Sequence, residues 1–268
     1  MTAVRSTRTV RRPPAVLLIL AALGMAVFLI PLVGLLARTP WRDLPALLVG
    51  DIVTDALRLS LFASLGATGI SAVVGIPLAF VLARVEFPGR AVVRGLVLLP
   101  LVIPPVVGGA ALLFALGRRG VIGEPLHEAT GLVLPFSMWG VIIATTFIAM
   151  PFLVITVEGA LRNLDPRYEG AASTLGAGPW TVLRRVTFPM IGPSLAAGLL
   201  LTWARALGEF GATITFAGNL QGRTQTLPLA VFVALESDRD TAVALSLILV
   251  AISLTVLVVL RERWWKVL

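Results

Sequence analysis

The feature that most constrains this chain is its series of long apolar segments separated by short polar connections. Six such segments occur, covering Ala15–Ala37 and residues 59–83, 95–116, 137–157, 190–217 and 241–260. About 20 consecutive apolar residues suffice for a helix to cross the hydrocarbon core of a bilayer. Only 13% of the 268 residues are charged, which is about half the share found in soluble domains. The sequence therefore predicts an all-α integral membrane protein with six transmembrane helices.

The basic residues are distributed unequally between the two sets of connections. If the N-terminus lies inside, the connections on that side hold 14 lysine and arginine residues, and the opposite connections hold 7. Cytoplasmic loops carry such an excess of positive charge, so both termini are expected in the cytoplasm, with tails at residues 1–14 and 261–268. Arg11 and Arg12 before an apolar segment also resemble a signal peptide. Because Ala15–Ala37 exceeds a usual signal-peptide core and no clear cleavage site follows, we interpret it as a retained first helix.

The composition argues against several kinds of chemistry. The chain has no cysteine, which excludes disulfides, iron–sulfur clusters and thiolate metal sites. Its single histidine, His127, lies in a polar loop, and the apolar segments contain no His/Asp/Glu group with metal-binding or acid–base spacing. The net charge of +8 comes from basic residues placed between apolar segments and not from one basic face. We therefore expect no catalytic residue, no metal, no cofactor and no nucleic-acid partner.

The connection at residues 158–190 is the part of the chain that most resembles a docking surface. Asp165 followed by Pro166 predicts a helix start, because aspartate caps free N–H groups and proline is tolerated at the first helical position. Gly176 permits a sharp turn, and Pro179 begins a second short helix. An amphipathic hairpin lying on the membrane is the alternative. That alternative does not account for the small residues that follow the single acid Glu169.

This segment resembles the EAA loop of ABC importer permeases. The resemblance rests on Glu169, Gly170, Ala171, Ala172, Gly176 and Pro189. The chain departs from the family pattern at Gly170, where alanine is usual, and at Phe188, where leucine is usual. The resemblance implies the type I ABC importer permease fold, in which this loop forms coupling helices that dock on a cytoplasmic ATPase. The chain has no G-x-x-x-x-G-K-[ST] motif and its only lysine is Lys266, so a separate chain would supply the ATPase.

Two further strings resemble the molybdate permeases within that family. They are LLPLVIPPVVG at residues 98–108 followed by GRRGVIGE at 117–124, and ARALGEFGAT at 204–213. The likeness covers about residues 55–260, which leaves the first helix at 15–37 as an addition. It implies a homodimer in the bacterial cytoplasmic membrane with two ATPase subunits and an extracytoplasmic oxyanion-binding protein. Sulfate permeases share the Gly-Glu-aromatic-Gly part, so sulfate or tungstate remain alternatives to molybdate.

Three prolines predict a break in the third apolar segment. Pro100, Pro104 and Pro105 remove helix N–H donors at membrane depth. Irregular backbone is tolerated there only when it is buried in protein or lines a watery cavity. The prolines therefore mark either a translocation pathway or a packed kink, and three of them within six residues favour the pathway.

Charged residues interrupt the fifth apolar segment. Arg205 and Glu209 are one helical turn apart and can pair on one face. An ionised side chain within a span costs roughly 2.5–3.5 kcal/mol, so we expect the two to be paired or to face water. They are interpreted either as part of a gate around Gly208 or as a structural ion pair. Thr213 and Thr215 are candidate polar wall residues for an oxyanion, which a pathway must hold only weakly.

Two other classes of function remain as alternatives to an ATP-driven importer. A passive anion channel or an ion-coupled carrier would need no ATPase. Nothing in the sequence resembles paired inverted halves with a carboxylate cluster for a coupling ion, which argues against the carrier. A membrane enzyme is disfavoured by the lack of catalytic residue groups within the spans.

Overall fold

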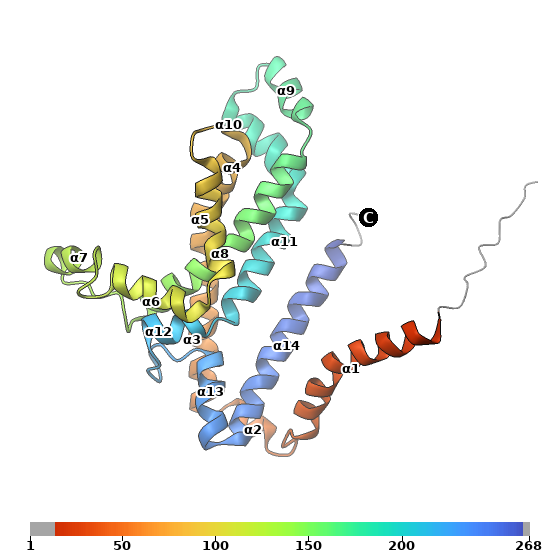
Figure 1. Cartoon of the computed structure of the whole chain (residues 1–268), viewed down its shortest axis with the longest axis vertical. Helices are drawn as coiled ribbons and strands as arrows, with labels where there is room; N and C mark the ends of the chain where they lie inside the picture. Colours follow the sequence, from red (N-terminus) through yellow and green to blue (C-terminus); the bar gives the residue numbers. More distant parts are fainter. Residues whose placement is uncertain (1–13, 265–268) are drawn as a thin grey trace, which may run out of the picture.

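The computed structural model describes residues 14–264, and this part of the chain consists of helices and loops without a strand (Figure 1). The elements are α1 Ala15–Ala37, α2 Leu44–Leu48, α3 Asp51–Ile70, η1 Ser71–Gly75, α4 Ile76–Arg84, α5 Arg90–Val102, α6 Pro105–Leu116, α7 Gly123–Thr130, α8 Met138–Asn163, α9 Pro166–Thr174, α10 Pro179–Val182, η2 Leu183–Thr187, α11 Phe188–Leu207, α12 Gly211–Ala217, α13 Leu227–Ser237 and α14 Arg239–Trp264. Five helical segments are long and apolar enough to cross a membrane, and α5 with α6 makes a sixth if this bent pair is one span. The predicted all-α membrane fold is confirmed.

The predicted boundaries differ from the structure within the fifth apolar segment and near the C-terminus. Residues 190–217 were expected to form one helix, but α11 ends at Leu207 and a separate helix, α12, begins at Gly211. Residues 261–264, expected in a C-terminal tail, belong to α14. The remaining parts of the two predicted tails, residues 1–13 and 265–268, lie outside the described residues.

Helix α8 is the centre of the fold, and it packs against α3, α4, α11 and α12 (Figure 1). Ser137 precedes it and accepts a hydrogen bond from the N–H of Gly140 at 3.1 Å, which caps a free donor at the helix start. The side chains of Leu153, Val154 and Val157 are almost completely buried. In α11 the small residue Gly198 lets the two helices approach, because an added Cβ would lie 3.1 Å from Leu153.

Two spans contain a π-helical turn, and each turn is followed by a proline at the second position of the next helix. Turn η1 (Ser71–Gly75) precedes Pro77 of α4, and η2 (Leu183–Thr187) precedes Pro189 of α11. Because proline has no N–H, regular α-helical hydrogen bonding cannot be complete at these positions. Wide turns of this kind are frequent at functional sites.

The third apolar segment is bent, as the three prolines predict. The chain bends by 120° between α5 and α6, across a short break. Ile103 has an extended backbone, with ψ of 145°, which is the conformation that a following proline imposes. Helix α5 therefore stops at Val102, and α6 runs sideways from the bundle at about half its height (Figure 1).

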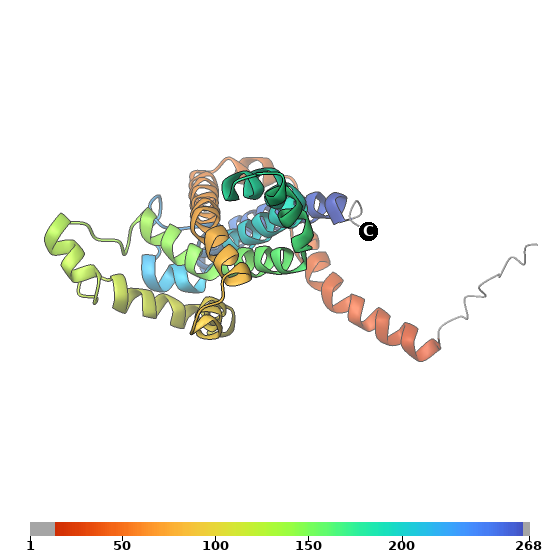
Figure 2. The same cartoon turned by 90° about the horizontal axis from the view of Figure 1, so that it is seen from above.

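Helix α1 stands apart from the rest of the molecule. Both views show it leading away from the bundle (Figures 1 and 2). None of the residues in its apolar stretch is buried, whereas 61% of the residues in the apolar stretch of α8 are buried. Its side chains are apolar on all sides, with a mean hydropathy of 2.9. An apolar helix of this length without packing partners in its own chain must be covered by lipid or by another chain.

The outer ends of α3, α13 and α14 form a separate small core that includes Val53, Leu227 and Leu245. The N–H of Leu227 donates to the Ser60 hydroxyl at 2.6 Å, which ties the start of α13 to α3. Asp238 precedes α14 and accepts hydrogen bonds from the Thr241 hydroxyl and from nearby backbone N–H groups. These hydrogen bonds to the charged carboxylate, led by that of the Thr241 hydroxyl, lower the pKa of Asp238 below its ordinary value.

Candidate functional site

The connection between α8 and α11 forms the helix–turn–helix expected from its sequence. Asp165 accepts a hydrogen bond from the N–H of Arg167 at 2.9 Å and so caps α9. Gly176 has a φ of 85°, a left-handed conformation that glycine adopts without a steric cost. The N–H of Ala177 then donates to the carbonyl of Ala172 at 3.1 Å, which closes the end of the helix as in a Schellman motif.

This connection, which we call the coupling hairpin (residues 165–182), projects from one end of the molecule. Figure 1 shows α9 at the end of the bundle opposite to α2 and α13. Large apolar side chains on it face outward: Leu175 is 89% exposed, and Trp180 and Tyr168 are also exposed. Gly170 and Ala171 are exposed as well. An exposed surface with large apolar side chains on a projecting hairpin is typical of a protein interaction site.

Glu169 points back toward the spans and does not lie at the tip of the hairpin. Its Oε2 lies 3.1 Å from Nη2 of Arg84, the last residue of α4. Its Oε1 accepts a hydrogen bond from the Thr187 hydroxyl at 2.7 Å. One carboxylate thus holds the hairpin to α4 and to η2, the turn before α11. Arg84 and Thr187 were not foreseen as its partners, because nothing in the sequence indicates that residues 84 and 187 lie near residue 169.

A second group of charges lies at the same end of the bundle. Glu158 of α8 is mostly buried, and its Oε1 accepts hydrogen bonds from Arg94 of α5. Arg162 lies one turn further along α8, with its Nε 3.1 Å from the same oxygen. Beside this group, Nε of Arg90 donates to the carbonyl of Leu82 at 2.9 Å, which satisfies a free acceptor near the end of α4. The only sequence signal for this cluster was the four-residue spacing of Glu158 and Arg162.

The charged pair in the fifth apolar segment is formed as its spacing suggests. Arg205 Nη2 lies 2.6 Å from Glu209 Oε2, and the Glu209 side chain is only 2% exposed against 29% for Arg205. The other carboxylate oxygen of Glu209 accepts from the N–H of Ala212 at 2.8 Å. Glu209 therefore caps α12, and together with the exposed Gly208 it forms the break between α11 and α12 that sequence reasoning missed.

The two predicted pathway segments lie against each other, because α6 packs on α12. A Cβ added to Gly211 would lie 2.8 Å from Pro105, and one added to Gly109 would lie 2.8 Å from the carbonyl oxygen of Ala212. Pro104 is exposed, whereas Pro100 is buried in α5. The proline break and the turn around Glu209 therefore form one irregular region within the fold.

The two candidate wall threonines lie in different environments. Thr215 is half-buried and its hydroxyl donates to the carbonyl of Gly211 at 2.9 Å. Thr213 is completely buried, and within the described part of the chain its hydroxyl has no hydrogen-bond partner. Thr213 can line a path only if the surrounding helices move apart, and its unpaired hydroxyl would then gain a partner.

Replacing Gly109 by alanine is expected to destabilise the protein by about 1–3 kcal/mol, the usual cost of overpacking a tight contact. The added methyl group would meet backbone atoms of Ala212 at 2.8–2.9 Å, and backbone cannot rotate away as a side chain does. Thermal unfolding of the purified protein in detergent measures the loss. Gly95→Ala is the matched control, since no atom lies within 4 Å of its added Cβ. Equal unfolding temperatures for the two variants would contradict the close contact between α6 and α12.

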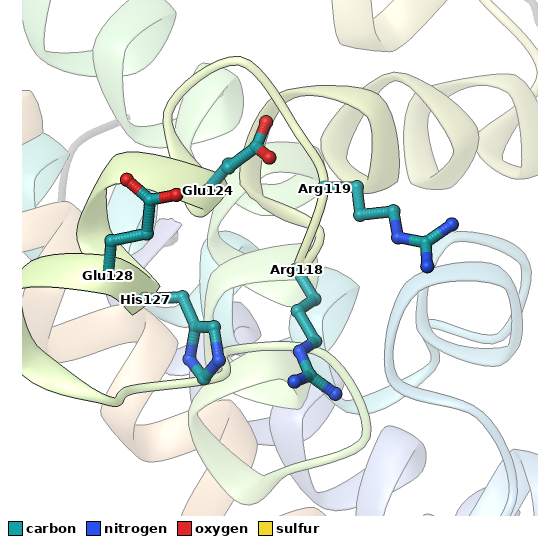
Figure 3. A pocket seen from close by; sticks show the side chains of 5 residues that line it. All are labelled: Arg118, Arg119, Glu124, His127 and Glu128. Carbon is teal, nitrogen blue, oxygen red and sulfur yellow. The ribbon is translucent and has the colours of Figure 1, made fainter.

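The outer connection between α6 and α8 contains a cavity of about 450 Å³ lined by charged side chains of both signs. The lining residues are Arg118, Arg119, Glu124, His127 and Glu128. Arg118 and His127 point to the same side, whereas Arg119 points away from them (Figure 3). The two glutamates offset the two arginines, so this cavity has no excess of positive charge of the kind that a free oxyanion would need.

Comparison with known proteins identifies the family. The family model described as binding-protein-dependent transport system inner membrane component matches residues 75–266. The chain belongs to this family. It is a permease subunit and a multi-pass protein of the inner membrane.

Relatives within the family are named for molybdenum and for sulfate. The molybdenum transport system permease protein ModB of Mycobacterium tuberculosis is 47% identical over 83% of this chain and 84% of that protein. The protein of the same name from Escherichia coli is 39% identical over 80% of this chain and 95% of that protein. The sulfate transport system permease protein CysT of Escherichia coli is 35% identical over 78% of this chain and 76% of that protein.

A solved structure with the same fold is that of a bacterial ABC transporter involved in the import of the acidic polysaccharide alginate. It matches with a TM-score of 0.69, covers 94% of this chain and 93% of the matched chain, and is 19% identical in sequence. At this identity the likeness concerns the fold alone. It supports the type I importer architecture that the EAA-like loop implies.

Proposed function

We propose that the chain is the membrane-spanning subunit of an ATP-driven importer that moves molybdate across the cytoplasmic membrane. The observation that carries the proposal is the 47% identity with a molybdenum permease over most of both chains. Within one organism, Escherichia coli, the molybdenum permease is also more similar to this chain than the sulfate permease is, at 39% against 35%. Sulfate is the second candidate solute, because a sulfate permease is also similar to this chain and because sulfate and molybdate are both tetrahedral dianions. Tungstate is the third candidate.

The proposed assembly is a homodimer with two cytoplasmic ATPase subunits and an extracytoplasmic oxyanion-binding protein. Helix α1 is apolar and packs on no core of its own chain. Helix α6 also exposes large apolar side chains, among them Val106 and Phe114. These surfaces support a second copy as a partner, because a single chain leaves them uncovered. The coupling hairpin supports the ATPase, since exposed apolar side chains project there beyond the spans.

In this proposal, movement of the ATPases displaces the coupling hairpin, and Glu169 passes the displacement to the spans. Its carboxylate holds both Arg84 of α4 and Thr187 of η2, so the two spans follow the hairpin together. The irregular region around Pro104, Pro105 and Gly208 is the candidate gate. Thr215, together with Thr213 once the helices separate, would offer hydroxyl groups to the oxyanion without a deep binding site.

Reconstitution in lipid vesicles tests the proposal. The permease with its ATPase and binding protein should accumulate molybdate only when ATP is supplied, and sulfate in about tenfold excess should lower the rate by less than about a tenth, as a site selective by about 3 kcal/mol would require. Vesicles that contain the permease alone are the control. Oxyanion uptake by the permease alone would favour a channel or a carrier instead. Competition by sulfate at equal concentration would favour the sulfate importer.

A further inference from the structure

Two clefts adjoin each other at the base of the coupling hairpin and share one wall residue, Trp180. The first, here called the apolar cleft, has a volume of about 330 Å³ and is lined only by apolar residues of α4, α8, α10, η2 and α11. They include Ile76, Phe80, Leu161, Trp180, Leu183 and Phe188. The second, here called the basic cleft, has a similar volume and is formed by Trp180, Thr181, Arg184 and Arg185.

The basic cleft carries positive charge that the described residues do not neutralise. Arg184 and Arg185 are exposed, and neither takes part in any of the ion pairs found between residues 14 and 264. The guanidinium group of Arg184 lies over the Trp180 ring, 6.0 Å from its centroid. This contact is a cation–π interaction, and it holds one arginine at the boundary between the two clefts. The two clefts together therefore have one apolar end and one cationic end.

The clefts lie toward the cytoplasmic ends of segments that are long enough to span a membrane. The walls of the apolar cleft come from α4, α8 and α11, which belong to segments long enough to span a membrane. The basic cleft lies where these spans give way to the hairpin, on the side that the excess of arginine assigns to the cytoplasm. Tryptophan concentrates at this depth in membrane proteins, and basic pockets between helices on this side bind lipid head groups.

We propose that the two clefts bind one anionic phospholipid of the cytoplasmic leaflet. An acyl chain occupies the apolar cleft, and the phosphate group lies against Arg184 and Arg185. Two observations support the assignment. The arginines of the basic cleft complement the negative charge of the phosphate group, and the volume of each cleft is at the lower end of the range for small-molecule sites. Trp180 lies in the first turn of α10, within the hairpin, and the other walls of the apolar cleft belong to the spans. A bound lipid therefore contacts both the hairpin and the spans. The inference requires only the membrane orientation of the chain and does not depend on which solute is transported.

Lipid binding to the purified full-length permease in detergent tests the proposal. Native mass spectrometry should show that phosphatidylglycerol binds more tightly than phosphatidylcholine. In the double variant Arg184→Gln/Arg185→Gln, the affinity for phosphatidylglycerol should fall at least about tenfold, since each basic residue near a lipid surface contributes roughly 1 kcal/mol. Val81→Phe, which places a larger side chain in the wall of the apolar cleft, should weaken the binding of both lipids.

The outer pair of adjacent arginines supplies the matched control. Arg118→Gln/Arg119→Gln removes the same charge from the opposite side of the protein and should leave phosphatidylglycerol binding unchanged. Unaltered binding in the Arg184/Arg185 variant, or an equal loss in the outer variant, would overturn the proposal. Unaltered lipid binding together with weaker ATPase association in the Arg184/Arg185 variant would assign these arginines to the ATPase instead. Because neither readout uses solute uptake, failure here is distinguishable from failure of the importer proposal.

Discussion

Tryptophan in place of Gly176 is expected to lower ATP-driven uptake by about tenfold while the protein still inserts into the membrane. Gly176 has a φ of 85°, and no atom lies within 4 Å of the position that a Cβ would take. The added Cβ therefore meets no packing clash, and the cost of placing it there is the strain of a left-handed residue, about 1–2 kcal/mol. That strain shifts the hairpin away from its native turn, which changes how α9 is presented to an ATPase. Uptake into vesicles and the amount of inserted protein are the two measurements.

Two glycine variants separate backbone strain from other effects. Gly176→Asn should retain most of the uptake, because asparagine tolerates the left-handed conformation. Gly170→Ala lies in the same exposed hairpin, within α9, and its Cβ would meet no atom within 4 Å. It should transport normally and be slightly more stable, since alanine is favoured over glycine within a helix. Normal uptake by Gly176→Trp would count decisively against a role for the hairpin in coupling.

Removal of the Arg205 side chain is expected to destabilise the permease more than neutralisation of Glu209. Arg205→Ala leaves a carboxylate that is 2% exposed without its cationic partner, and loss of one member of a buried pair costs about 3–5 kcal/mol. In Glu209→Gln the side-chain carbonyl can still accept from the Ala212 N–H. Arg205, which is 29% exposed, can then turn to water, so the loss should be only about 1–2 kcal/mol. Thermal unfolding in detergent ranks the variants.

The double variant Arg205→Ala/Glu209→Gln shows whether the pair acts as a unit. Its destabilisation should be smaller than the sum of the two single effects, because it leaves no unpaired charge. Uptake should follow stability in all three proteins if the pair is structural. A normal unfolding temperature with abolished uptake in Glu209→Gln would instead assign the carboxylate to a gate.

Much of the fold could be predicted because lipid imposes simple requirements on a chain. The lengths of the apolar segments and the distribution of arginine were sufficient to predict the spans. The prolines at 100, 104 and 105 were sufficient to predict the bend between α5 and α6. The end of α11 was missed because apolar character continues from residue 190 to 217 apart from Arg205 and Glu209. Hydropathy does not register that the Glu209 carboxylate caps a new helix at Gly211.

The candidate site was predictable only in its local part. Asp165, Gly176 and Pro179 act within a few residues of themselves, so the helix–turn–helix could be foreseen from turn and capping preferences. The partners of Glu169 and Glu158 come from distant segments of the chain. A single sequence carries no signal for such contacts, because any of several arginines on the cytoplasmic side satisfies the same charge rule.

The wide turns η1 and η2 determine where the spans can flex. Turn η2 lies at the hairpin end of its span, and η1 ends nine residues before Arg84, where the second span ends. Glu169 contacts Arg84 and Thr187, the last residue of η2. A helix under load yields first where its hydrogen-bond ladder is incomplete. Displacement of the hairpin is therefore expected to bend the chain at η1 and η2. Helices α3 and α11, which lie beyond these turns, would then tilt as rigid bodies.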